Sequence, residues 1–205
     1  DTISEAKKST EWSSRMSKAS RIIVDSLKEA SRLSEQLAIE LRDGPRARFI
    51  AVTGTPGTGK TTAVGKLLER LRAKNHRIGG FIQPALEEEG RRTGYDLLDL
   101  ATDERRPFAR KKAEGRGYDF DEDGWSWAAD RLDHAHEHGD IMVVDELGKL
   151  ESEGEGHMVH LRKLTRRPGN AIVLIAAVRG GTLDNLTQSL GIPAMLLEAP
   201  VDDEA

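Results

Sequence analysis

The hydrophobic and polar positions of this chain follow two patterns, one in an amino-terminal segment and one in the rest of the sequence. Residues 1–43 contain neither Gly nor Pro. Within them, residues 11–42 carry apolar side chains at helical spacing. Their series at seven-residue intervals is Met16, Ile23, Ala30 and Leu37. We therefore predict a helical extension over residues 1–43, which either packs on its own domain or contacts a second copy or a protein partner through residues 11–42.

Residues 46–200 show short apolar runs that alternate with helical patterns and are predicted to form one domain. Strands are predicted over residues 48–53, 77–83, 93–100, 106–110, 141–144, 171–178 and 194–197, and helices over 60–74, 123–138, 156–166 and 182–190. Buried strands alternating with helices are typical of a largely parallel sheet with helices on both faces, so we expect an α/β fold. The Glu-, Arg- and Gly-rich residues 85–93 are predicted to be a mobile loop.

The composition narrows the classes of function. The chain has 205 residues and a net charge of −4, which argues against a general nucleic-acid binder because such proteins usually carry a basic excess. Cysteine is absent, which excludes disulfides, thiolate metal sites and a Cys nucleophile. No apolar run approaches the ~18 residues of a membrane span, and no signal peptide is evident. We expect a cytoplasmic protein without a membrane segment.

Residues 54–61 match the Walker A pattern at every position, between a predicted strand and a predicted helix. Glycines in such a loop let the backbone approach a polyanion, and the N–H groups at the helix start bind phosphate. Lys60 is expected to contact the β- and γ-phosphates, Thr61 to ligate Mg²⁺, and Thr62 to reach the α-phosphate. The motif predicts binding of ATP or another nucleoside triphosphate. Its residues are Gly54, Thr55, Pro56, Gly57, Thr58, Gly59, Lys60 and Thr61.

A pair of carboxylates follows the apolar strand predicted over residues 141–144. In P-loop proteins an Asp at a strand end holds Mg²⁺, often through water, which makes Asp145 a candidate metal ligand. A Glu in the next position can polarise the attacking water, so Glu146 is a candidate catalytic residue. Lys149 either brings a second positive charge to the γ-phosphate or is a solvated loop lysine.

Two arginines are further candidates for phosphate binding. Arg179 follows the predicted strand 171–178, at the edge where ligands bind in open α/β sheets. Arg110 belongs to a basic run, residues 105–112, which either faces phosphates or an acidic partner or forms the solvated edge of a hairpin.

Three blocks of residues resemble the cancer-related nucleoside-triphosphatase family of small P-loop proteins. The first block is residues 54–62. The second joins Gly79-Gly80-Phe81 to residues 91–96 and to Ala109-Arg110. The third block, Val-Asp-Glu-Leu-Gly-Lys-Leu-Glu at residues 144–151, is similar to the family's Asp-Glu-Ile-Gly-Lys-Met-Glu sequence.

The resemblance covers residues 47–198 and implies a compact P-loop fold that hydrolyses nucleoside triphosphates to diphosphate and phosphate with Mg²⁺. It also implies tolerance of several nucleotides. Gln83-Pro84 departs from the family, in which a Thr and acidic residues are expected. The family's functional positions correspond here to Gly59, Lys60, Thr61, Asp145 and Glu146, with Lys149 and Arg110 as further matches.

Two alternatives to hydrolysis share this type of loop. A small-molecule or nucleotide kinase needs an acceptor pocket and often an Arg-rich lid, for which residues 105–112 are the candidate. A nucleotide-gated interaction module would instead use the nucleotide to control docking through residues 1–43. The sequence contains no guanine-reading Asn-Lys-x-Asp motif and no adenine-specific signature, so the base is left open.

Overall fold

A mixed sheet of nine strands organises the protein in a computed structural model. The structure describes residues 48–54, 59–169, 173–179, 181–192 and 194–198. The helical extension expected over residues 1–43, with its predicted contact surface at 11–42, lies outside the described residues. The strands are β1 (Arg48–Thr53), β2 (Ile78–Ile82), β3 (Ala85–Glu88), β4 (Arg91–Asp99), β5 (Arg105–Lys111), β6 (Tyr118–Phe120), β7 (Ile141–Leu147), β8 (Val173–Val178) and β9 (Ala194–Glu198).

One half of the sheet is parallel, as the sequence predicts. Its strands pair in the order β2-β7-β8-β1-β9, with every pair parallel. Every residue of β8 is buried, because a strand covered on both faces needs apolar side chains at consecutive positions. We refer to these five strands as the parallel half.

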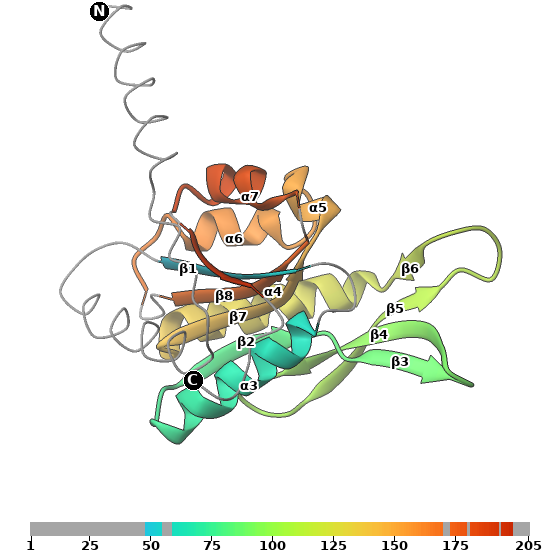
Figure 1. Ribbon diagram of the computed structural model, residues 1–205, viewed down its shortest axis with the longest axis horizontal. Coiled ribbons are helices and arrows are strands. Elements are labelled where there is room, and N and C mark those ends of the chain that lie inside the picture. The colour runs from blue at the N-terminus through green and yellow to red at the C-terminus, as the bar shows by residue number, and fades with distance from the viewer. Residues whose placement is uncertain (1–47, 55–58, 170–172, 180, 193, 199–205) are drawn as a thin grey trace, which may run out of the picture.

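Helices cover both faces of the parallel half (Figure 1). Alternation along β1 sends Ile50 and Val52 into a core with α3 (Lys60–Ala73). Phe49 and Ala51 point the opposite way, into a second core. The helices that supply that second core are α4 (Glu122–His138), α6 (Met158–Leu164) and α7 (Leu183–Leu190). The expected α/β architecture is therefore present, and among the described helices none is long and apolar enough to span a membrane.

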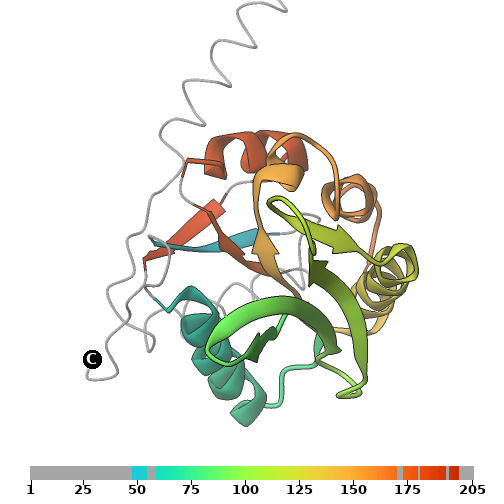
Figure 2. The ribbon, with the colours of Figure 1, turned by 90° about the vertical axis from the view of Figure 1, so that its right-hand side faces the viewer.

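The other half of the sheet is antiparallel, so the fold is less uniformly parallel than expected. Strand β4 pairs antiparallel with β2, β3 and β5, and β5 pairs antiparallel with β6. Residues 93–100 and 106–110, both predicted as strands, lie largely within β4 and β5, which pair with each other. Figure 2 looks onto this end of the molecule, with the long curved strands in front of the parallel half. We call β3–β6 the antiparallel extension.

The prediction of a mobile loop over residues 85–93 is wrong, because these residues form a hairpin. Strand β3 pairs with the start of β4 through a tight turn at Glu89 and Gly90, where φ is 50° and 74°. Both residues lie in the left-handed region that two-residue hairpin turns need. Strand β3 is largely exposed, so its polar side chains hide the strand from a search for hydrophobic alternation.

The Gly79-Gly80 pair allows β2 to sit close to its neighbours. A Cβ on Gly79 would lie 2.7 Å from the Cβ of Ala135 on α4. Gly80 has a φ of 92°, and a Cβ there would collide with the carbonyl oxygen of Val143 on β7. These two glycines of the second sequence block therefore have a structural role in packing β2 against α4 and β7.

Candidate active site

A cavity of about 470 Å³ lies where the ends of β7 and β8 meet the start of α3. Ligand sites in open α/β sheets form at the carboxyl ends of parallel strands. The cavity brings together five of the predicted site residues: Thr61, Asp145, Glu146, Lys149 and Arg179. Its other wall comes from the antiparallel extension and from α4.

The Walker A residues lie in the sequence between β1 and α3, and α3 contributes Thr61 to the cavity lining. Gly59 adopts a φ of 84° immediately before Lys60, the first residue of α3. Lys60 donates a hydrogen bond from Nζ to the carbonyl oxygen of Gly54, at 3.0 Å. The side chain thus points back toward the end of β1. Thr55, Pro56, Gly57 and Thr58 lie outside the described residues.

The hydroxyl-bearing residues of the first turn of α3 occupy different places. Thr61 is exposed and lines the cavity. Thr62 is also exposed but is not among the residues that line the cavity. The position of Thr61 suits the metal role predicted for it, and the α-phosphate role of Thr62 stays a prediction.

Asp145 lies at a β-bulge in β7. The register with β8 pairs Val144 with Ala176 and Glu146 with Ala177, so Asp145 is the extra residue. A bulge interrupts the strict alternation of side chains across a strand. Asp145 and Glu146 consequently line the same cavity, although neighbouring residues of a regular strand point to opposite faces.

Asp145 is a buried carboxylate suited to a cation. Its side chain is 3% exposed, and its Oδ2 accepts a hydrogen bond of 2.8 Å from the Gln83 N–H. Oδ1 is buried without a well-formed hydrogen bond to the described residues. Burial raises the pKa of Asp145 to about 6, with a smaller contribution from nearby Glu146, while the Gln83 N–H and the Thr61 hydroxyl oppose the rise.

These features fit Mg²⁺. The ion usually takes one or two protein oxygens and completes its octahedron with water and phosphate oxygens. Thr61 and Asp145 supply such oxygens, and the orphaned Oδ1 would gain a partner. No group of three or more metal-ligating side chains is found among the described residues.

Glu146 is more accessible than Asp145. Its side chain is 45% exposed, and Oε1 lies 3.6 Å from an Nη of Arg179. This pairing places Arg179 beside the carboxylate predicted to orient water. The location agrees with the position of Arg179 directly after β8, at the edge of the sheet where ligands bind. Lys149 is exposed on the cavity rim, where it pairs with Glu153 at 3.7 Å.

Glu151, which also lines the cavity, holds together the segment from Gly148 to His157, a role that was not predicted. It is 5% exposed and accepts hydrogen bonds from the Gly148 N–H at 2.9 Å and the His157 N–H at 3.2 Å. Burial raises its pKa, and these backbone donors oppose the rise. By closing the Gly148–His157 segment, Glu151 positions Lys149 at the start of α5 (Lys149–Ser152).

Arg110 lies away from the cavity lining. Its guanidinium donates to Asp96 Oδ1 and to the carbonyl oxygen of Tyr95, both at 2.9 Å. Asp96 is 8% exposed, and a largely buried carboxylate needs such a partner. In this structure Arg110 therefore stabilises the β4–β5 pair, and its phosphate role has no geometric support.

Aromatic side chains line the wall opposite the carboxylates, and sequence analysis did not group them. They are Tyr95, Phe108, Tyr118, Phe120 and Trp125, which come from β4, β5, β6 and α4. The rings form two contacting groups: Tyr95 packs on Tyr118 with centroids 5.3 Å apart, and Phe108, Phe120 and Trp125 pack together, with centroids 5.4 Å apart for Phe120–Trp125. The only early signal was the alternation of Tyr118 and Phe120 about Asp119.

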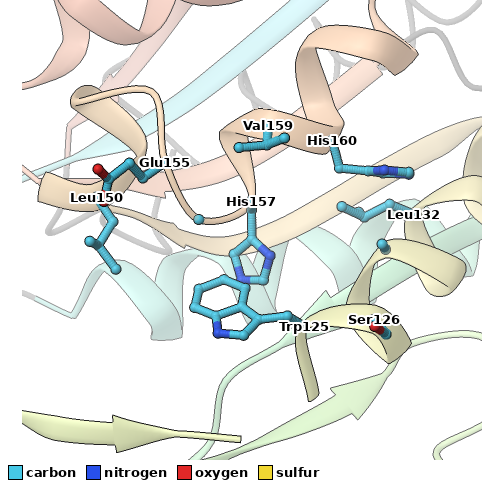
Figure 3. A pocket seen from close by; sticks show the side chains of 10 residues that line it. Trp125, Ser126, Leu132, Leu150, Glu155, His157, Val159 and His160 are labelled. Carbon is cyan, nitrogen blue, oxygen red and sulfur yellow. The ribbon is translucent and has the colours of Figure 1, made fainter. Parts of the chain in front are cut away.

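A second cavity of about 530 Å³ shares Trp125, Leu150 and His157 with the first. Figure 3 shows the His157 ring against Trp125, with Leu150 to one side and Leu132 and His160 to the other. His157 is 4% exposed, and burial, with a smaller effect of His160, lowers its pKa to about 3. His157 is therefore a neutral packing residue between the two cavities.

Residues 49–192 match the model of a protein family described as NTPase. The chain belongs to this NTPase family. It is 30% identical over 129 residues to nucleoside-triphosphatase THEP1 of Methanopyrus kandleri, covering 62% of this chain and 72% of that protein. The THEP1 protein of Saccharolobus solfataricus is 31% identical, over 54% of this chain and 66% of that protein. The solution structure of a human cancer-related nucleoside triphosphatase matches with a TM-score of 0.56 and 26% identity, covering 73% of this chain and 88% of that one.

Membership of the NTPase family confirms the resemblance found in the sequence. It also confirms the assignment of the chain to a nucleoside-triphosphatase enzyme class with a P-loop α/β fold. The match begins in β1 and ends just before β9, so it spans both the parallel half and the antiparallel extension.

Proposed function

We propose that this NTPase hydrolyses nucleoside triphosphates by a Mg²⁺-assisted attack of water on the γ-phosphate. The observation that carries the proposal is the bulge at Asp145, which directs both Asp145 and Glu146 into one cavity with Thr61. A metal carboxylate and a water-orienting carboxylate must lie close together for this reaction, and a regular strand would separate them.

Each protein group has a distinct part in the proposed reaction. Glu146 orients the water and takes its proton as the oxygen attacks the γ-phosphorus. The bond from the γ-phosphorus to the β–γ bridging oxygen breaks, and nucleoside diphosphate and phosphate leave. Lys60 neutralises charge on the β- and γ-phosphates in the ground and transition states. Thr61 and Asp145 would hold Mg²⁺, which would supply electrostatic stabilisation of the phosphate oxygens.

Lys149 and Arg179 are proposed to supply further positive charge near the γ-phosphate. Both lie on the cavity rim and are largely exposed, so they are free to reorient toward a bound γ-phosphate. Arg179 already contacts Glu146. An arginine there can hold the carboxylate away from phosphate in the empty site and then neutralise the negative charge that develops during transfer.

Phosphoryl transfer to an acceptor remains a second candidate, because the cavity is larger than a water molecule needs. A nucleotide-gated module acting through residues 1–43 has no observation in its favour, since those residues lie outside the described part of the chain. The cytoplasmic location stays a prediction.

The proposal is tested by phosphate release from ATP, GTP, CTP and UTP, each with Mg²⁺ and with EDTA. We expect turnover of several nucleotides that disappears with EDTA. Lys60→Ala should lose nucleotide affinity and reduce kcat/KM by about 10³-fold, since the ammonium contacts phosphate in both states. The matched control is Lys163→Ala, an exposed residue on α6. Full turnover without divalent metal, or unchanged nucleotide affinity in Lys60→Ala, would contradict the proposal.

A further inference from the structure

The aromatic wall of the cavity is larger and more accessible than a site for water requires. We call the set Tyr95, Phe108, Tyr118, Phe120 and Trp125 the aromatic recess. Phe120 is 42% exposed, one of only two large hydrophobic side chains exposed to this degree among the described residues. Its neighbour Phe108 is 2% exposed and supports it from behind, with ring centroids 5.3 Å apart.

The local strand geometry directs these rings toward the cavity. Tyr118 and Phe120 are alternate residues of β6, so they share one face. Asp119 between them is exposed and pairs with Lys112 at 3.7 Å. Strand β6 thus directs Tyr118 and Phe120 to the cavity, while Asp119 is not among the residues that line it. Exposed ring faces at this spacing can stack on a planar ligand.

A cationic group stands beside the rings. Arg92 lines the same cavity, donates to the Tyr95 hydroxyl at 3.0 Å, and lies over the Tyr95 ring with its guanidinium carbon 5.4 Å from the centroid. Its side chain is 52% exposed. A guanidinium at the rim of an aromatic recess matches a ligand that carries both a planar ring and an anionic group, because arginine pairs with phosphate in a bidentate geometry.

The position of the recess distinguishes it from the place of the hydrolysed nucleotide's own base. The phosphate-binding loop follows β1, and the proposed γ-phosphate position lies at Asp145 on β7, with β8 between these strands. The recess lies farther along the same direction, past β2, on β4–β6. In a nucleoside triphosphate the ring is attached at the α-phosphate end, opposite the γ-phosphate. The recess is therefore beyond the γ-phosphate, on the side from which water would attack.

We infer that the aromatic recess binds a second ligand of the nucleoside monophosphate class, with its ring on Phe120, Tyr118 and Trp125 and its phosphate near Arg92. The inference rests on the proposed function only in placing the γ-phosphate at Asp145. A ligand seated there shares the cavity with Glu146 and limits the access of bulk water to that carboxylate.

The test starts from protein saturated with a nucleoside diphosphate and Mg²⁺, the diphosphate being the one formed from the protein's best substrate. Nucleoside monophosphates are titrated into this complex, and their binding is measured by calorimetry. The diphosphate occupies the phosphate-binding loop, so a monophosphate can bind only elsewhere. We expect one additional molecule to bind per chain. Ribose 5-phosphate, which has no ring, should bind at least about tenfold more weakly, since stacking of a base on an aromatic residue contributes at this level.

Variants of the recess locate the additional molecule. Phe120→Ala and Phe120→Leu should each weaken monophosphate binding about tenfold, because both remove the planar face and the second retains apolar volume. Arg92→Gln should weaken binding of the monophosphate but leave binding of the uncharged nucleoside within about twofold. The control is Val159→Ala, the other large hydrophobic residue exposed in the described part of the chain, which lines the second cavity.

Three results would overturn the inference: no monophosphate binds the diphosphate complex, the monophosphate displaces the diphosphate, or Val159→Ala weakens binding as much as Phe120→Ala. Displacement would assign a monophosphate to the triphosphate site. None of these titrations depends on turnover. A failure of the recess is therefore separable from a failure of hydrolysis, which is measured by phosphate release.

Discussion

The parallel half and the antiparallel extension contribute different chemistry to one cavity. Strands β7 and β8 are almost wholly buried and apolar until their carboxyl ends, where Asp145, Glu146 and Arg179 emerge. The extension is exposed on much of its surface and presents aromatic rings. The comparison indicates that the charged groups proposed to act on phosphate lie at the ends of strands covered on both faces, whereas the rings of the aromatic recess lie on the more exposed side of the cavity.

The connection between the two regions contributes a hydrogen bond to the site. Gln83 follows β2, where the chain leaves the parallel half for the extension, and its N–H donates to Asp145. The pairing between β2 and β4 is short, involving Phe81 with Asp99 and Ile82 with Leu98. Asp145, the proposed metal ligand, is therefore held in part by the connection to the extension, so the two regions are structurally linked at the site.

The largest effect is expected from Glu146→Gln in the parallel half. This substitution should slow the chemical step while nucleotide binding is largely kept. The substitution keeps the size of the side chain but removes its charge and basicity. We expect kcat to fall by about 10²–10⁴-fold, with Mg²⁺-nucleotide affinity largely retained. Single-turnover phosphate release and nucleotide titration measure the two quantities. Glu155→Gln, an exposed carboxylate that lines only the second cavity, is the control.

Near-normal turnover in Glu146→Gln would move the water-orienting role away from this carboxylate. Lys149 on the rim would be the next residue to substitute. Turnover that appeared only with an added hydroxyl acceptor would favour phosphoryl transfer over hydrolysis.

A smaller effect is expected from Asp145→Asn, which should stabilise the metal-free protein. The folded carboxyl has a pKa of about 6, above the unfolded value near 4, so its ionised form destabilises the metal-free protein at neutral pH. The neutral amide should raise the free energy of unfolding at pH 7 by up to about 3 kcal/mol. The gain should shrink as the pH falls from 6 toward 4, where wild-type Asp145 becomes protonated.

Urea unfolding in EDTA at pH 7 and pH 4.5 measures this difference in the free energy of unfolding. Phosphate release measured against Mg²⁺ concentration shows how far the substitution weakens the dependence of turnover on the metal. Asp184→Asn, on the first turn of α7, is a control remote from the cavity lining. Equal stability of wild type and Asp145→Asn at pH 7 would show that Asp145 is not held in an unfavourable ionised state.

The sequence predicted the parallel half well because its signals are local. Strands β1, β7 and β8 appear as consecutive apolar residues, and α3 as a helical stripe after the glycine-rich loop. The extension was recovered only in part. Strand β3 is polar and exposed, and β6 has three residues, so neither has enough buried positions to produce a detectable period.

The site divides in the same way. Lys60, Thr61, Asp145 and Glu146 follow from motifs of adjacent residues, which require no knowledge of tertiary structure. The bulge at Asp145, by contrast, depends on how β7 pairs with β8. The aromatic recess collects residues from four elements between Tyr95 and Trp125. Contacts between elements so far apart depend on strand pairing, which a single sequence does not specify.

The smallest effect concerns His157, whose ring packs where the two regions meet. It contacts Phe81 of β2, Phe108 of β5 and Trp125 of α4, with ring centroids 4.9, 5.8 and 4.6 Å away. Burial lowers its pKa to about 3, below the unfolded value near 6.5. The unfolded chain therefore binds a proton between these values that the folded protein does not, so the contribution to stability present above pH 6.5 is lost as pH falls.

We expect His157→Leu to remove this dependence. Wild type should lose about 1.4 kcal/mol of unfolding free energy per pH unit through His157 once the pH is below 6.5. The difference between variant and wild type should therefore shift in the variant's favour by about that amount between pH 7.5 and pH 5.5. Urea unfolding at the two pH values measures the shift, which is independent of any constant packing loss in the smaller leucine. His138→Gln, an exposed histidine on α4, should leave the wild-type pH dependence in place. If His157→Leu also kept the wild-type pH dependence, the His157 imidazole of the wild type would be protonated in the folded state. The apolar junction between the parallel half and the extension would then have to admit a charge.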